Sequence, residues 1–289
     1  MRKILLFLLL FAAGNYVTAA KPAYRIFDAA GDSVSYQQML DQLLTEDIVF
    51  FGELHNNPIA HWLQLELTRD MHSASRRTLV LGAEMFEADD QLIVDEYLKG
   101  YYKESNFKEE VKLWDNYKTD YRPLLEFARE KELGFVATNV PRRYASMVSR
   151  GGFEALEKLS DQAKGYIAPL PVPYDPDLPG YQKMLRMAHM PGGKANKENL
   201  PRAQAVKDAT MAHFILKNWD EEVLFLHYNG TYHSNNHEGI VWYIEQYAPG
   251  TDVGTIATVQ QSQLEQLSED HQDLADFILV VDEDMTTTY

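Results

Sequence analysis

The feature that most constrains the fold is a series of short, predominantly apolar segments separated by longer amphipathic stretches. A strand formed by such a segment is apolar on both faces, and strands of that kind occur in parallel sheets covered by helices on both sides. The sequence therefore predicts an α/β fold with a mostly parallel sheet and helices on both faces. The segments that we predict as strands are 24–27, 47–51, 78–82, 134–138, 223–226, 253–258 and 277–281.

Helix start signals lie between the first of these segments. Ser35 and Gln38 form a capping-box pattern, which predicts a helix that ends near residue 44. Pro58 has the position of a first helical residue, because proline has no N–H to lose there and its backbone is already suited to the helix. We predict that this second helix continues to about residue 71.

Two intervals between predicted strands, 91–133 and 143–217, are longer than a crossover between parallel strands requires. The second contains a proline-rich stretch at 168–179. We expect both intervals to be helical insertions that act as a lid over a site.

The first twenty residues have the order of a secretory signal peptide. Arg2 and Lys3 are followed by a ten-residue apolar run and then by small residues at 17–20. The apolar run is too short to span a bilayer. We therefore predict that residues 1–20 are a signal peptide and that 21–289 form one exported domain, located in the periplasm or cell envelope.

Composition excludes several classes of function. The formal net charge of −16 opposes binding to nucleic acid, whose phosphates are also negative. The chain has no cysteine, so we expect neither a cysteine-linked lipid nor a thiolate metal site. We also expect no spanning membrane segment in residues 21–289.

Polar side chains follow the predicted strands at the points where the strands end. They are Glu53, His55, Glu84, Asn139, Arg142 and His233. Ligands bind at the carboxyl ends of the strands in an α/β sheet, so we expect these side chains to lie together. For any one residue taken alone, a helix cap or a turn is the simpler explanation.

Two of these strand ends carry a Gly-x-x-His pattern, at 52–55 and 230–233. Glycine lets the backbone turn sharply, so the imidazole three residues later can point back over the sheet edge. Neutral histidine and carboxylate groups bind manganese, cobalt, zinc or iron. His55, Glu84 and His233, with Glu53 beside them, therefore form a candidate site for a divalent metal.

Five motifs, taken in order, resemble those of the ChaN family. This family is the haem-binding uptake branch of a superfamily that also contains the Tiki proteases and the erythromycin esterases. The motifs are Phe51-Gly-Glu-Leu-His-Asn-Asn-Pro58, Glu84-Met-Phe86, Asn139-Val-Pro-Arg142, Arg202-Ala-Gln204 with the segment 207–212, and Gly230-Thr-Tyr-His233. The resemblance covers most of residues 21–289. It implies an α/β sandwich with a helical insertion, export to the cell envelope, and a role in haem or iron acquisition. The partner it implies is haem or another small apolar ligand, and in a chain without cysteine any haem must bind non-covalently.

The same resemblance leaves two other functions open. The first is a metal-dependent hydrolase that cleaves a peptide or an ester, in which Glu53, His55, Glu84 and His233 surround the metal or the attacking water. The second is a non-catalytic interaction module of the envelope. In that module the strand-end motifs would only stabilise the scaffold.

Haem binding needs an apolar surface, an iron ligand and basic groups for the propionates. The candidate haem-binding residues are Tyr174, Tyr181, Met184 and His189 of the second insertion, together with Arg142 at a strand end. Tyr181, Met184 and His189 share one face of a predicted helix. Packing of the lid is the alternative explanation for such a face. A flat apolar slot is also self-complementary, which leaves a homodimer open.

Overall fold

The computed structural model of the chain describes residues 21–188 and 198–289. The predicted signal peptide and the candidate ligand His189 lie outside the described residues. Within them the chain forms one sheet of eight strands. The strands are β1 (Tyr24–Asp28), β2 (Ser33–Val34), β3 (Ile48–Glu53), β4 (Thr78–Glu87), β5 (Gly134–Asn139), β6 (Val223–Gly230), β7 (Val253–Gln261) and β8 (Phe277–Asp282).

The strand order is β2-β1-β8-β7-β3-β6-β4-β5. β1 runs antiparallel to β2 and β8, and every other pairing is parallel. The predicted mostly parallel α/β sheet is therefore confirmed. β2 is absent from the sequence prediction because two residues form no periodic pattern, and it exists only by pairing with β1.

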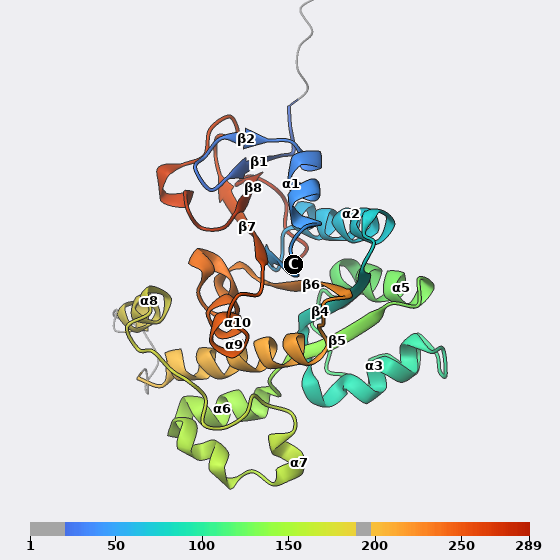
Figure 1. Cartoon of the computed structure of the whole chain (residues 1–289), viewed down its shortest axis with the longest axis vertical. Helices are drawn as coiled ribbons and strands as arrows, with labels where there is room; N and C mark the ends of the chain where they lie inside the picture. The colour runs from blue at the N-terminus through green and yellow to red at the C-terminus, as the bar shows by residue number, and fades with distance from the viewer. Residues whose placement is uncertain (1–20, 189–197) are drawn as a thin grey trace, which may run out of the picture.

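Helices cover both faces of this sheet (Figure 1). The cluster on one face includes residues of α1 (Tyr36–Leu43), α2 (Pro58–Ala74), α3 (Gln91–Leu98), α4 (Glu104–Glu110) and α5 (Arg122–Glu130). The cluster on the other face includes residues of α6 (Arg142–Gly151), α7 (Asp161–Lys164), α8 (Pro179–Ala188), α9 (Leu200–Lys217) and α10 (Ile240–Tyr247). Short helical segments lie at Ala88–Asp90, Tyr117–Tyr121, Phe153–Lys158, Thr231–His233, Asn235–His237 and Glu269–His271.

Both predicted helix starts are confirmed. The Ser35 hydroxyl accepts a hydrogen bond from the backbone of Gln38, and the Gln38 side chain accepts one from the backbone of Ser35. Pro58 is the first residue of α2, and Asn57 caps the helix by accepting bonds of 3.0 Å from the N–H groups of Ile59 and Ala60. The cap satisfies N–H groups that have no partner within the helix.

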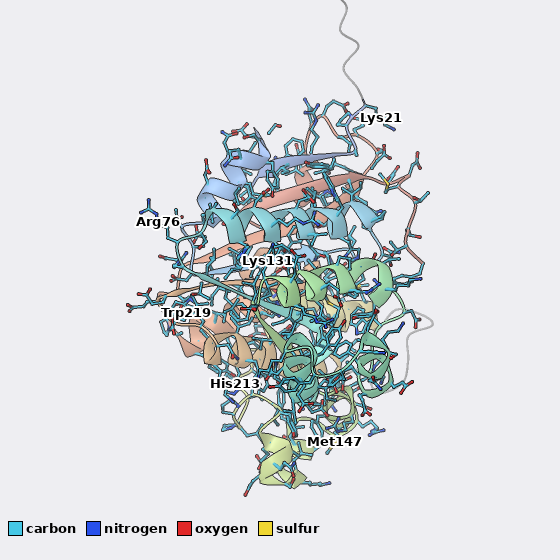
Figure 2. All side chains as sticks on the ribbon, turned by 90° about the vertical axis from the view of Figure 1, so that its right-hand side faces the viewer. Lys21, Arg76, Lys131, Met147, His213 and Trp219 are labelled. Atoms are coloured by element: carbon cyan, nitrogen blue, oxygen red, sulfur yellow. The ribbon has the colours of Figure 1, made fainter. Side chains whose placement is uncertain are left out.

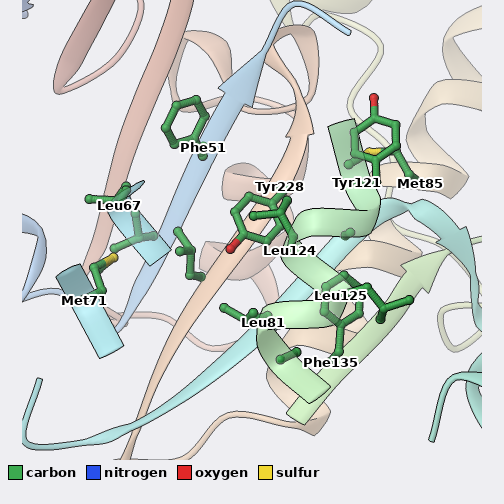
Figure 3. Packing of buried hydrophobic residues seen from close by; sticks show 14 of the residues in the cluster. Phe51, Leu67, Met71, Leu81, Met85, Tyr121, Leu124, Leu125, Phe135 and Tyr228 are labelled. Atoms are coloured by element: carbon green, nitrogen blue, oxygen red, sulfur yellow. The ribbon is translucent and has the colours of Figure 1, made fainter. Parts of the chain in front are cut away.

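The core lies on both sides of the sheet because neighbouring residues of a strand point in opposite directions. In β3, Val49 and Phe51 belong to the cluster beneath α1 to α5, whereas Ile48 and Phe50 belong to the cluster beneath α9 and α10. Figure 3 shows the first cluster, in which side chains of β3, β4, β5 and β6 face helices α2 and α5. The labelled residues are Phe51, Leu67, Met71, Leu81, Met85, Tyr121, Leu124, Leu125, Phe135 and Tyr228.

The two long intervals between strands are mainly helical. The interval 91–133 contributes α3, α4 and α5, and the interval 143–217 contributes α6 to α9. Lys21 and Met147 lie toward opposite ends of the molecule, so the second interval extends the fold away from β1 and β2 (Figure 2). None of the helices in the described part of the chain is long and apolar enough to cross a membrane.

Candidate functional site

Three neighbouring strands bring the predicted polar residues to one edge of the sheet. Glu53 ends β3 and is the direct register partner of Gly230, which ends β6. On the other side of β6, Ala83 of β4 pairs with Tyr228, so Glu84 follows at nearly the same level. His55 and His233 lie shortly after the two strand ends. The parallel arrangement therefore gathers Glu53, His55, Glu84 and His233, although they span 181 positions of the sequence (233 − 53 + 1).

A buried ion-pair cluster surrounds His233. Its Nε2 lies 3.1 Å from Oε1 of Glu84, and its Nδ1 pairs with a carboxylate oxygen of Asp208. The second oxygen of Glu84 accepts a hydrogen bond of 2.7 Å from the N–H of Gly230. Asp208 comes from α9, and its other oxygen accepts a bond of 3.2 Å from the Tyr181 hydroxyl. Each carboxylate thus has both oxygens engaged.

The charges of this cluster favour a protonated His233. Burial opposes protonation, but the carboxylates of Glu84 and Asp208 outweigh it and raise the pKa of His233 to about 10. Burial likewise opposes ionisation of Glu84, but the His233 imidazolium and the Gly230 N–H hold its pKa well below the usual range. A carboxylate on each side of an imidazolium is the arrangement in which a buried charge is both paired and hydrogen-bonded.

His55 has a separate carboxylate partner. Its Nδ1 lies 2.8 Å from Oε1 of Glu53, and the same oxygen accepts a bond of 2.7 Å from the Tyr121 hydroxyl. Gln64 donates to the other oxygen of Glu53 at 2.5 Å. Burial opposes protonation of His55, but the hydrogen bond to Glu53 and the charges of Glu84 and Glu53 raise its pKa.

His55 is the most accessible of the four strand-end groups. Its side chain is 34% exposed, whereas that of Glu53 is fully buried and those of Glu84 and His233 are 5% and 7% exposed. Its ring is steeply inclined to that of Trp114, with an interplanar angle of 70° and ring centroids 4.9 Å apart. His55 is therefore the group that this network presents to a ligand.

Gly230 is the point at which the two halves of the site meet. A Cβ atom built at Gly230 would lie 2.7 Å from Nε2 of His55 and 3.5 Å from Oε2 of Glu84. Any larger residue therefore collides with the histidine. The glycine of the second Gly-x-x-His pattern thus provides space for His55, in addition to a turn.

We expect Gly230→Ala to move the His55 ring away from Glu53 and to lower the free energy of unfolding by about 1–3 kcal/mol, as is usual for overpacking. The pKa of His55, measured by NMR titration, should fall as the bond to Glu53 is lost. Gly134→Ala is the control, because a Cβ there meets only Val80 at an ordinary 3.5 Å. A pKa of His55 that stays at its wild-type value in Gly230→Ala would contradict this account.

A cavity of about 1250 Å³ opens above the strand-end residues. Among the described residues, seven large apolar or aromatic side chains are strongly exposed, and four of them line this cavity. These four are Met187, Leu200, Tyr232 and Tyr289, and Tyr232 is 72% exposed. Exposed apolar groups that are concentrated around one cavity indicate a place where an apolar ligand or a partner protein binds and covers them.

Three basic side chains also line the cavity, namely Lys112, Arg142 and Lys207. None of the three lies within ion-pair distance of a carboxylate belonging to residues 21–188 or 198–289. They are therefore free to bind an anionic group of a ligand.

The candidate haem-binding residues are distributed unequally. Met184 and Arg142 line the cavity, as does Tyr181, which is only 4% exposed. Burial and the Asp208 carboxylate raise the pKa of Tyr181, which keeps its phenol protonated. Tyr174 is not among the residues that line the cavity, and its ring packs against Tyr181 and Phe153, each at a centroid distance of 5.5 Å.

No group of three or more His, Asp or Glu side chains in the described part of the chain is arranged to hold a metal ion. A physical reason lies in the hydrogen bonds of the site. Both nitrogens of His233 face carboxylates, and a histidine must be neutral at the nitrogen that binds a metal. His55 directs one nitrogen to Glu53, whose two oxygens are already engaged.

The helical position of Asp208 leaves open whether it points into the strand-end site or pairs with Arg202 or Lys207, and in the structure it pairs with His233. Several other residues of the site were not predicted from the sequence. Asn116, Asp120 and Tyr121 come from the first long interval, where only a cluster of polar and aromatic residues beside Trp114 could have indicated them. Tyr232 and Tyr289 were missed because exposure cannot be read from residue type.

Solved structures with the same fold include ChaN of Campylobacter jejuni, described as binding heme cofacially. It aligns with a TM-score of 0.65 at 17% identity, covering 89% of this chain and 96% of that chain. A Bacillus cereus protein aligns with a TM-score of 0.50 at 12% identity, covering 86% of this chain and 92% of that chain. An erythromycin esterase in its open conformation aligns with a TM-score of 0.46 at 12% identity, covering 89% of this chain and 82% of that chain.

A comparison with curated protein sequences found no match. The sequence does match a family over residues 39–244, which include every strand-end residue of the site. That family is described as haem-binding uptake, Tiki superfamily, ChaN. The motif resemblance in the sequence is thereby confirmed, and because the match covers well over half of the 289 residues, this chain belongs to the ChaN family of haem-binding uptake proteins.

Proposed function

We propose that this protein binds haem non-covalently in the strand-end cavity and serves haem or iron acquisition outside the cytoplasm. The observation that carries the proposal is the composition of the cavity wall. It combines exposed apolar and aromatic groups with basic side chains that form no ion pair within residues 21–188 and 198–289. Membership of the haem-binding uptake family supports the same function.

The cavity residues fit the chemistry of haem. A porphyrin needs apolar contact on its faces, and Met184, Met187 and Leu200 provide it. Its propionates need cations, for which Arg142, Lys112 and Lys207 are available. The cavity of about 1250 Å³ exceeds the roughly 300–1,000 Å³ of pockets for drug-sized ligands, so it has room for a plate of this size.

Tyr232 is the iron ligand that we favour from the geometry. Haem brings an iron that takes an oxygen, nitrogen or sulfur ligand from the protein. Tyr232 lines the cavity and is 72% exposed, so its phenol oxygen is accessible. The hydroxyl of Tyr181 instead donates to Asp208 and is held protonated by burial.

Titration of purified protein with hemin tests both the binding of haem and the role of Tyr232 as iron ligand. Wild-type protein should give a saturable Soret band, and Tyr232→Phe should weaken hemin binding by about tenfold or more, equivalent to about 1.4 kcal/mol. Tyr101→Phe is the control, because Tyr101 is 70% exposed but does not line the cavity. The predicted contacts Tyr181 and His189 are tested in the same way with Tyr181→Phe and His189→Ala. Absorbance that rises without a plateau would contradict haem binding, and an unchanged Tyr232→Phe spectrum would exclude Tyr232 as ligand.

Export and dimerisation belong to the same proposal. Residues 1–20 have the pattern of a signal peptide, and N-terminal sequencing of protein recovered from the envelope fraction checks for its removal. A homodimer would cover the exposed rim residues Met187, Leu200 and Tyr232. Sedimentation measured with and without hemin tests this, with a monomer under both conditions as the contrary result.

A metal-dependent hydrolase remains a prediction from the sequence. The convergence of Glu53, His55, Glu84 and His233 is the observation in its favour, whereas the engaged nitrogens of His233 do not suit a metal ligand. Metal analysis of protein purified without chelator, combined with assays for chelator-sensitive peptide or ester cleavage, tests for the hydrolase as opposed to a haem-binding protein without catalytic activity. Loss of cleavage in His55→Ala and His233→Ala would support the hydrolase.

A further inference from the structure

The segment that follows β8 returns to the strand-end site. β8 ends at Asp282, and Thr288 donates a backbone hydrogen bond of 2.9 Å to the carbonyl of Asn56, just after β3. β7 lies between β8 and β3 in the sheet. Residues 283–288 therefore pass the end of β7 and span two inter-strand distances, about 10 Å. Figure 1 shows the C-terminus over the middle of the sheet.

Thr288 is held at a second point. Its hydroxyl donates a hydrogen bond of 2.9 Å to Asp120, a carboxylate that is 4% exposed. Asp120 also accepts a bond of 2.7 Å from the Asn116 amide, and the same amide donates to the carbonyl of His55 at 2.8 Å. The segment is thus attached to the network that positions the backbone of His55.

This attachment places Tyr289 at the cavity. Tyr289 lines the cavity together with Trp114 and Asn56, and yet 63% of it is exposed. The two hydrogen bonds of Thr288 restrict the backbone that carries Tyr289, which costs conformational entropy. The Tyr289 ring nevertheless buries little surface within the chain. The geometry therefore leaves most of the Tyr289 side chain available for contact with a flat ligand in the cavity.

We infer that Tyr289 is a porphyrin-contacting residue and that Thr288 positions it, so that residues 283–289 form one wall of the haem site. This inference rests on the proposed function, because the ligand that it contacts is haem. The contact is made by the ring and does not involve iron. Burial, together with the carboxylates of Glu53, Asp120 and Asp115, raises the pKa of Tyr289, which keeps its phenol protonated.

The test measures how fast hemin leaves each variant for an excess of apomyoglobin. Tyr289→Ala should release hemin about tenfold faster than wild type, equivalent to about 1.4 kcal/mol of lost contact. Tyr289→Phe keeps the ring and should stay within about twofold of wild type. Thr288→Val keeps the shape of the side chain but removes the bond to Asp120. It should release hemin about fivefold faster, equivalent to the roughly 1 kcal/mol that a single hydrogen bond contributes.

Thr286→Val is the matched control for Thr288→Val, because its hydroxyl has no hydrogen bond with the described residues in the vicinity. Equal release from wild type and Tyr289→Ala would overturn the inference, as would a Tyr289→Phe variant that behaves like Tyr289→Ala. If wild-type protein shows no saturable Soret band, the proposed function itself fails. If wild-type protein gives a saturable Soret band and Tyr289→Ala releases hemin at the wild-type rate, the proposed function stands and this inference is wrong. Thermal melting of each variant checks that the fold is intact.

Discussion

Replacement of Glu84 by alanine is expected to lower the free energy of unfolding by about 3–5 kcal/mol, the usual cost of removing one partner from a buried ion pair. Glu84 is 5% exposed and bonds both His233 and the N–H of Gly230. The variant leaves a buried imidazolium with Asp208 as its remaining carboxylate, and it leaves the N–H without an acceptor. Denaturant unfolding monitored by circular dichroism measures the change.

Two further variants separate charge from packing. Glu84→Gln keeps an oxygen for the N–H of Gly230 but removes the negative charge, so its loss of stability should lie between those of wild type and Glu84→Ala. Glu87→Ala, on the same strand, removes a partly exposed carboxylate that forms no ion pair with the described residues, and it should change stability by about 0.5 kcal/mol or less. A Glu84→Ala variant as stable as Glu87→Ala would contradict the ion-pair account.

The free energy of unfolding is expected to be greatest near pH 6.5 and to decrease toward pH 10. The pKa of His233 is raised from 6.5 to about 10, so between these values the folded protein holds a proton that the unfolded chain releases. Stability then falls as the pH rises. Since each unit of pKa shift is worth about 1.4 kcal/mol, the decrease from this residue is on the order of 4 kcal/mol. The raised pKa of His55 acts in the same direction.

On the acidic side, groups with lowered pKa values reduce stability, whereas the raised pKa values of Asp90, about 6, and of Asp208 act in the opposite direction. Burial lowers the pKa of His227 from 6.5 to about 4, so stability falls as the pH drops through this range, where only the unfolded chain takes up the proton. The lowered pKa of Glu84 adds a loss below its ordinary value of 4.5. Urea unfolding at a series of pH values should show the maximum, and His233→Gln should lack most of the alkaline decrease. An alkaline decrease of wild-type size in His233→Gln would show that other groups cause it.

The residue pattern by itself was sufficient for seven of the eight strands, all but β2, and for the edge at which the polar groups gather. Val49 and Phe50 are neighbouring apolar residues of one strand and therefore point to opposite faces of the sheet. Both are buried, which requires a sheet that is covered on both sides. Parallel strands end at one edge, so the positions of Glu53, Glu84 and His233 after their strands were enough to group them. Local signals were equally reliable, because the Ser35 capping box and the Pro58 helix start depend on contacts within a few residues.

The partners of those groups could not be predicted. Asp208 reaches His233 because α9 packs across the sheet in one particular register, and a helix sequence does not specify which residue then faces the strand ends. Tyr121 and Gln64 reach Glu53 from two other helical segments for the same reason. These contacts join residues 11 to 68 positions apart, over which local propensity carries no information.

The architecture, the family and the strand-end residues thus follow from the residue pattern, because each depends on periodicity or on short ordered motifs. The folded chain was needed to show that His233 lies between two carboxylates, that His55 is the most exposed of the four strand-end groups, and that Tyr232 and Tyr289 line the cavity. The pKa and the exposure of a side chain depend on all the atoms around it. Those atoms come from segments whose relative positions are set by packing of the whole chain.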